Sequence, residues 1–225
     1  MTFLEIVNRI KRQCGVQGSQ LVSLLNQPEE ITRLADWANE AWMDIQLMHP
    51  DWNWMRASFS FATVQGQATY TPAQVGVTSW GRWKEDTLRT YLTATGTSTE
   101  LFLSVMDYEV WRNIYQFGVQ RAVFLRPVDI AITPNKSLAF GPVPIAGITV
   151  LGDYYVNATE MVVDTDKPAM PSQFHMLIVY MAMMRYGEYE SASEVFQAGM
   201  RGARKFKSDL MADYLDEITV GRPLT

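Results

Sequence analysis

Apolar residues recur with a helical period near both ends of the chain and with a strand period in between. On the segment that follows Pro28, one helical face carries apolar side chains for about five turns, namely Ile31, Leu34, Ala35, Ala38, Ala41, Trp42, Ile45 and Met48. From Met55 the period becomes two, with Ala57, Phe59 and Phe61 on the same side. A strand pattern cannot form one face of a helix, so the backbone must change from helix to strand near Pro50.

Two helices are predicted at each end of the chain. Thr2 and Glu5 have the spacing of a capping box, and Gly15 is a natural stop for the helix that they begin. The C-terminal pair follows Ser172, read as an N-cap, with a stop near Gly187. The apolar face of this first C-terminal helix is Phe174, Leu177, Ile178, Met181 and Ala182, and that of the second is Ala192, Phe196, Gly199, Ala203, Phe206, Leu210 and Tyr214. Gly199, Gly202 and Ala203 permit close helix packing.

The middle of the chain is rich in Thr, Gly, Val and Tyr and is predicted to form strands. We expect them near Ala68–Thr71, Thr87–Thr93, Thr97–Leu103, Arg121–Leu125, Ile130–Thr133, Ser137–Phe140 and Ile148–Val156. One short helix interrupts them, capped by Ser104 and Asp107, with a face of Met106, Val110, Trp111 and Ile114.

The predicted fold class is α+β. Residues 1–50 and 168–217 form a helical bundle, residues 51–167 a mostly antiparallel β insertion with one short helix, and residues 218–225 an extended tail.

Bulk properties exclude several classes of protein. A net charge of −5 argues against general affinity for nucleic acid, and a single cysteine, Cys14, allows no intrachain disulfide. The apolar run Met176–Met184 is nine residues long, whereas a membrane-spanning helix needs about 20. No membrane partner is therefore expected.

Catalytic groups are scarce. His49 and His175 are the only histidines and belong to no metal or triad motif, so neither a metal site nor a cofactor is expected. His175 is interpreted as a capping or interface hydrogen-bond partner. Asp164 with Asp166, and Glu188 with Glu190, imitate a glycosidase pair, but residues at i and i+2 of a helix do not face each other. We interpret them as surface or capping acids, with a hydrolase as a minor alternative.

Two sets of residues are candidates for protein contacts. Trp80, Arg82 and Trp83 lie in a stretch read as a Gly/Ser loop, where a protein interface, partial burial in the core and stacking on a sugar all remain open. Charges of opposite sign follow one another near the C-terminus, in Arg201, Arg204, Lys205, Asp209 and Asp213. They suit either a solvated helix face with intrahelical pairs or a head-to-tail contact between subunits.

Several stretches resemble the head-to-tail connector, or adaptor, proteins of tailed bacteriophages. They are FLEIVNRIKRQCGV, ADWANEAWMDIQLMHPDWNWMR, LSVMDYEVWRNIY, SLAFGPVP, ITVLGDYYVNATEM and DTDKPAMPSQFHMLIVYMAM, in the family-like order and across nearly the whole chain.

The resemblance implies a structural protein of the virion neck, assembled in the host cytoplasm. It implies a ring, typically of twelve copies, which binds the portal, extends the DNA channel and docks tail, stopper or nozzle proteins. DNA would pass without sequence-specific binding. In such proteins a C-terminal segment commonly reaches the portal, which here would be Ile218, Thr219, Val220, Gly221, Arg222, Pro223, Leu224 and Thr225. The alternative is a β-rich carbohydrate- or receptor-binding tail protein that uses Trp80 and Trp83.

Overall fold

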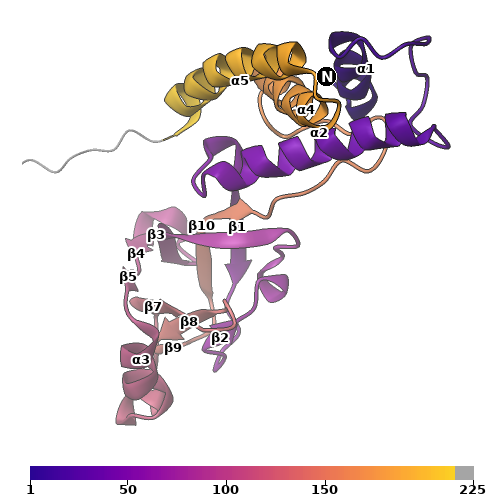
Figure 1. The fold of residues 1–225 in the computed structure, drawn as a ribbon. Coiled ribbons are helices and arrows are strands. Elements are labelled where there is room, and N and C mark those ends of the chain that lie inside the picture. Colours follow the sequence, from indigo (N-terminus) through magenta and orange to yellow (C-terminus); the bar gives the residue numbers. More distant parts are fainter. Residues whose placement is uncertain (216–225) are drawn as a thin grey trace, which may run out of the picture. The chain divides into compact units, whose positions relative to one another are not determined.

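The computed structural model describes residues 1–215, which form two compact units (Figure 1). A helical unit contains Met1–Met55 and the chain from Ala158 onward, and a β unit contains Arg56–Asn157. The fold is α+β with helices at both ends and a mostly antiparallel β region between them, as predicted.

The helical unit is built around its third long helix. It contains α1 (Phe3–Gln13), α2 (Glu29–Met48), α4 (His175–Tyr189) and α5 (Ser193–Tyr214), and α4 packs against the other three (Figure 1). A helix covered on several sides needs apolar residues around most of its circumference. This explains the apolar run in α4. Among the described helices, none has the length and apolar character needed to span a membrane.

The helix ends agree with the sequence at α1 and differ at the start of α4. The Thr2 hydroxyl accepts the N–H of Glu5 at 3.2 Å, and the Glu5 carboxylate accepts the N–H of Thr2 at 2.9 Å, which confirms the capping box. The predicted Ser172 cap is wrong, because Ser172–Phe174 forms a 3₁₀ turn, η6, without a side-chain cap. The α4 helix ends at Tyr189, two residues beyond Gly187, in agreement with the predicted stop near that glycine.

Glycines allow α5 to lie directly on α4. A Cβ atom at Gly199 would come within 2.7 Å of the Tyr180 carbonyl oxygen, and one at Gly202 within 2.6 Å of the Tyr180 ring. Gly187 on α4 is equally close to Phe196 on α5. The prediction that small residues permit close packing here is confirmed.

Two amide side chains on α2 hold the linker that precedes α4. Gln46 exchanges two hydrogen bonds with the backbone of Thr159, at 3.0 and 3.1 Å, and Asn39 does the same with Met161, both at 2.9 Å. Asn39 and Gln46 are seven residues apart and so lie on one helix face. They act like a neighbouring strand and keep the linker extended along α2.

Two four-stranded sheets and one short strand pair form the β unit. The first sheet has the order β1 (Arg56–Ala62), β10 (Ile148–Val156), β3 (Trp80–Leu92) and β4 (Leu101–Phe102). The second has the order β2 (Thr69–Tyr70), β8 (Leu138–Gly141), β7 (Asp129–Ile132) and β5 (Ser104–Val105), and β6 (Phe124–Leu125) pairs with β9 (Val143–Pro144). Pairing is antiparallel except between β5 and β7 and between β6 and β9.

One core lies among these strands. Its buried residues are Phe59, Tyr70, Val75, Val77, Trp83, Leu88, Leu103, Ile130, Leu138, Phe140 and Val150. Short turns of helix complete the chain, at η1 (Asn53–Met55), η2 (Ala73–Val75), η3 (Gly96–Thr99) and η5 (Val119–Ala122).

Several local predictions for the β unit are wrong. The stretch read as a loop at Trp80 is part of β3, and residues predicted as strand form the helical turns η3 and η5. Ser104 belongs to β5 and caps nothing, whereas Asp107 does cap α3 (Tyr108–Trp111), which continues as the π-helical turn η4 (Arg112–Gln116). These segments are short, and their conformation depends on partners distant in sequence.

Candidate interaction surfaces

The surroundings of His175 are those of a residue that stabilises the fold. Its side chain is buried, Nε2 lies 2.8 Å from the carbonyl oxygen of Met170, and Nδ1 lies 2.6 Å from the nitrogen of Met1. Burial lowers the pKa of the imidazole, which favours the neutral ring. His49 packs edge-on against Trp52 instead, with the ring centroids 5.3 Å apart. Residues 1–215 contain no group of three or more potential metal ligands.

The paired carboxylates in the linker hold backbone. Asp164 accepts the N–H of Leu24 at 3.0 Å. Asp166 accepts the N–H groups of Val162 and Val163 at 2.7 and 2.9 Å, and these bonds lower the pKa of its carboxyl group. These N–H groups lie in loops and not at the start of a helix, so neither carboxylate is a helix cap, which was one of the two interpretations.

The tryptophan cluster divides between core and surface. Trp83 is only 3% exposed, and its indole N–H donates to the carbonyl of Lys136 at 2.8 Å. It therefore offers no face for stacking on a sugar. Trp80 is partly buried with its ring centroid 5.8 Å from that of Trp83, and Arg82 is exposed with its guanidinium 5.0 Å from the centre of the Tyr155 ring.

The charged residues of α5 all face solvent. Arg201, Arg204, Lys205, Asp209 and Asp213 are exposed, and within residues 1–215 none of the five forms an ion pair. The intrahelical pairs of the solvated-face interpretation are therefore not formed. Ile218–Thr225, the predicted portal-binding segment, lies outside the described residues.

A large apolar surface in the β unit was not predicted. The segments Leu101–Val105 and Phe124–Val128 run side by side, because the N–H of Ser104 donates to the carbonyl of Val128 at 2.8 Å and the Arg126 guanidinium donates to the carbonyl of Thr99 at 2.6 Å. We name as the apolar ridge their exposed side chains, which are Leu101, Phe102, Val105, Phe124, Leu125 and Val128.

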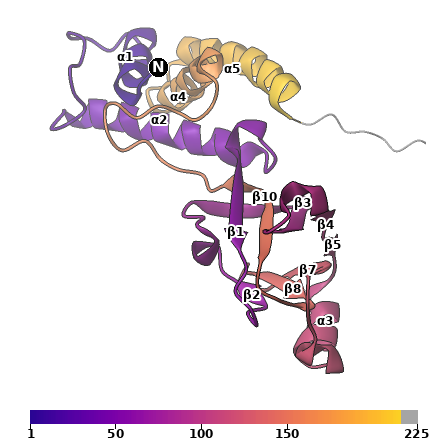
Figure 2. The ribbon, with the colours of Figure 1, turned by 180° about the vertical axis from the view of Figure 1, so that it is seen from behind.

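The ridge lies on the side of the unit where Figures 1 and 2 show β4 and β5. Its dense apolar sequence without strict alternation is the signal for it in the sequence, where strands are predicted over Thr97–Leu103 and Arg121–Leu125 and a helix cap at Ser104.

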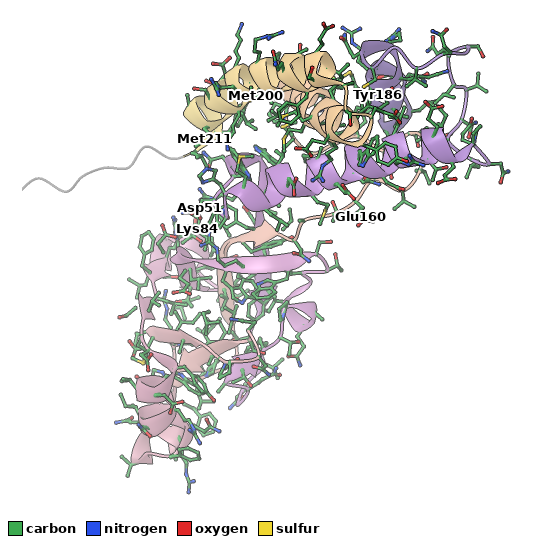
Figure 3. All side chains as sticks on the ribbon, in the orientation of Figure 1. Asp51, Lys84, Glu160, Tyr186, Met200 and Met211 are labelled. Carbon is green, nitrogen blue, oxygen red and sulfur yellow. The ribbon has the colours of Figure 1, made fainter. Side chains whose placement is uncertain are left out.

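A second unpredicted surface lies on the helical unit. Leu25, Val162 and Val163 border a cavity of about 520 Å³. Leu25 is 77% and Val162 79% exposed. We name as the valine groove the apolar lining of this cavity, Phe3, Leu24, Leu25, Ala35, Met161, Val162 and Val163, and Asp36 and Glu160 also line it. Figure 3 shows Glu160 on the linker alongside α2.

The β unit also has an open cavity of about 700 Å³. Its aromatic lining residues are Tyr108, Trp111 and Tyr115, and the rest are Ala68, Thr69, Thr71, Gln74, Gln116, Thr133, Pro134, Asn135 and Ser137. No histidine or carboxylate is among these lining residues, and the Tyr115 hydroxyl donates to the Asp129 carboxylate.

The described residues thus expose two apolar surfaces, the ridge and the valine groove, and a row of charges on α5. The chain matches the family model of the SU10 adaptor protein over residues 1–224. This chain belongs to the SU10 adaptor family. Comparison with curated proteins gives no significant match.

Membership of the SU10 adaptor family makes the chain a structural adaptor of a bacteriophage. The family is one of head-to-tail adaptors and is not an enzyme family. The chain is accordingly a virion component, and the family implies interaction with portal and tail proteins. The resemblance found in the sequence is confirmed.

Proposed function

We propose that this SU10 adaptor forms a ring beneath the portal, extends the DNA channel and docks tail components. The family match over nearly the whole chain carries the proposal. Exposed surfaces support it: within residues 1–215 the side chains of the apolar ridge, Leu25, Val162 and Val163 of the valine groove and the charges of α5 are exposed. A chain made for assembly is expected to expose such surfaces before it meets its partners.

The negative net charge of the chain suits a conduit for DNA. Phosphate groups are repelled by carboxylates, so a channel wall of this charge lets DNA slide without sticking. An electropositive lumen wall in the assembled ring would contradict this part of the proposal.

Assembly on the portal is tested by mixing the purified chain with its portal protein and imaging the particles. We expect the free chain to be a monomer or weak oligomer and to form a ring only on the portal. Portal particles that stay bare under conditions where both proteins are folded would refute the proposal.

The segment Ile218–Thr225 is proposed to dock to the portal. Its deletion should abolish portal binding while leaving the far-UV circular dichroism and the thermal unfolding of the chain unchanged. Portal binding by the truncated chain at the affinity of the full chain would refute this role. The α5 set of Arg201, Arg204, Lys205, Asp209 and Asp213 is proposed as part of a subunit contact. Trp80 and Arg82 are proposed as part of a tail-protein or neighbour contact, from which burial in the core excludes Trp83.

A further inference from the structure

We propose that the apolar ridge of one copy binds the valine groove of the next copy, as the repeating contact of the assembly. This inference rests on the proposed function for the ring, but the two surfaces and their chemistry are properties of the described residues. The occupant proposed for each surface is a second copy of this chain.

The ridge has the size and rigidity of a binding surface. Phe102 is 64% and Phe124 47% exposed, which leaves on the order of 200 Å² of aromatic surface in water, and four aliphatic side chains extend it. Apolar patches above a few hundred Å² are rare on a monomer and mark interaction sites. The backbone is held by pairing of β4 with β3 and of β5 with β7, so little conformational entropy is lost on binding.

Charges of both signs border the ridge, since the Arg89 guanidinium lies 4.3 Å from the centre of the Phe102 ring and pairs with Glu100 at 2.8 Å. Arg126 donates to the backbone carbonyls of Thr90 and Thr99, and Arg121 is exposed. Across the part of the chain that the structure describes, neither forms an ion pair with a carboxylate. A complementary partner therefore presents apolar side chains flanked by acids.

The valine groove has this chemistry. Val162 and Val163 stand between Glu160 on one side and Asp164 and Asp166 on the other, and Asp36 lines the same cavity. The Asp166 carboxylate accepts the N–H groups of both valines. The side chain of Asn39, on α2, accepts the N–H of Met161 in the linker. The two valines are thus presented to solvent by a fixed turn.

The charge of the two units agrees with this pairing. Residues 56–157 contain eight Lys and Arg against seven Asp and Glu, which leaves eleven against seventeen for the rest of the chain. The formal net charge of the β unit is therefore +1 and that of the helical unit is −6. Two different surfaces make a heterologous contact, which closes into a ring where the rotation between successive copies allows it.

The contact is also expected to be weak when it occurs alone. Stable interfaces bury about 800 Å² on each partner, and the ridge offers only part of that area. A portal that holds copies side by side raises their effective concentration to about the millimolar range, where a weak contact forms. This accounts for a chain that assembles on a template and stays dispersed without one.

The experiment uses two variants of the full chain, Phe102→Cys and Val162→Cys, each with one added exposed cysteine and a tag of different mass. Native Cys14 is buried, and burial raises the pKa of its thiol to about 12, so it contributes no background. The two variants are mixed at high concentration and treated with a bis-maleimide cross-linker. Because the cysteines are on separate chains, every covalent dimer of mixed mass is intermolecular.

We expect the mixed dimer to exceed either homodimer by about tenfold, which corresponds to a preference of about 1.4 kcal/mol. The control replaces Val162→Cys by Leu47→Cys, which is 68% exposed on α2 and outside the groove, and should give no excess of mixed dimer. Circular dichroism of each variant verifies that it is folded.

A mixed dimer no more abundant than in the Leu47→Cys control, or a Phe102→Cys homodimer in excess, would overturn the inference. Portal recruitment of the wild-type chain is measured separately. If the chain forms rings on the portal but gives no excess of mixed dimer, this contact alone is refuted. If the mixed dimer forms as expected but the chain does not bind the portal, only the proposed function is refuted.

Discussion

Substitution of Gly199 by alanine measures how closely α5 approaches α4. In an exposed helix this change stabilises by about 1 kcal/mol, because glycine has more backbone freedom to lose. Here the new Cβ would lie 2.7 Å from the Tyr180 carbonyl oxygen and 3.2 Å from the Met183 Cβ atom. A backbone oxygen cannot rotate away, so the helices must separate, and overpacking of this kind costs about 1–3 kcal/mol. We expect a net loss of about 1 kcal/mol.

The loss is measured by urea unfolding followed by far-UV circular dichroism, and amide hydrogen exchange locates it in α4 and α5. In thermal unfolding it corresponds to about 2–4 °C for a chain of this size. The control is Ser208→Ala on the exposed face of α5, where only helix propensity acts and a gain of a few tenths of a kcal/mol is expected. If the free energy of unfolding of Gly199→Ala is about 1 kcal/mol higher than that of the wild type, the close approach of the two helices is refuted.

Three further outcomes are expected. Since burial lowers the pKa of His175 in the folded chain, the unfolded state takes up a proton first as the pH falls below about 6.5. Stability should therefore fall on acidification, by at most about 1.4 kcal/mol per pH unit from this group, and urea titrations of His175→Gln should lack that component. Thr2→Ala should lose about 1 kcal/mol by removing the acceptor for the Glu5 N–H, whereas Thr2→Ser should retain it in the same assay. Cys14 should react with a thiol reagent only as fast as the chain unfolds, and immediate reaction in native buffer would contradict its burial.

The long helices could be predicted because their signals are local. The apolar face of α2 and the capping box of α1 are contained within the segments that they organise, and both agree with the structure. The close contact at Gly199 could also be predicted, since a glycine inside a helical pattern indicates that another helix packs closely against it. The family resemblance added a function that no single motif carries.

The β unit shows where prediction from one sequence stops. Trp80 looked like a loop residue, because the glycine and serine around it are turn signals. In the structure β3 begins there and pairs with β10, a partner some seventy residues away in sequence. Short segments such as η3 and η5 take their conformation from such distant neighbours, which sequence spacing does not show.

By itself, the sequence determined the long terminal helices, the β character of the middle of the chain and the kind of protein, because periodicity and family likeness are properties of consecutive residues. Only the tertiary structure decided which apolar side chains are covered. Trp83 is in a core and Phe102 is in water, although both are large aromatic residues in the same β region. Burial depends on what other parts of the chain are folded against a residue, and within residues 1–215 the side chains of the ridge and the two valines of the groove stay exposed.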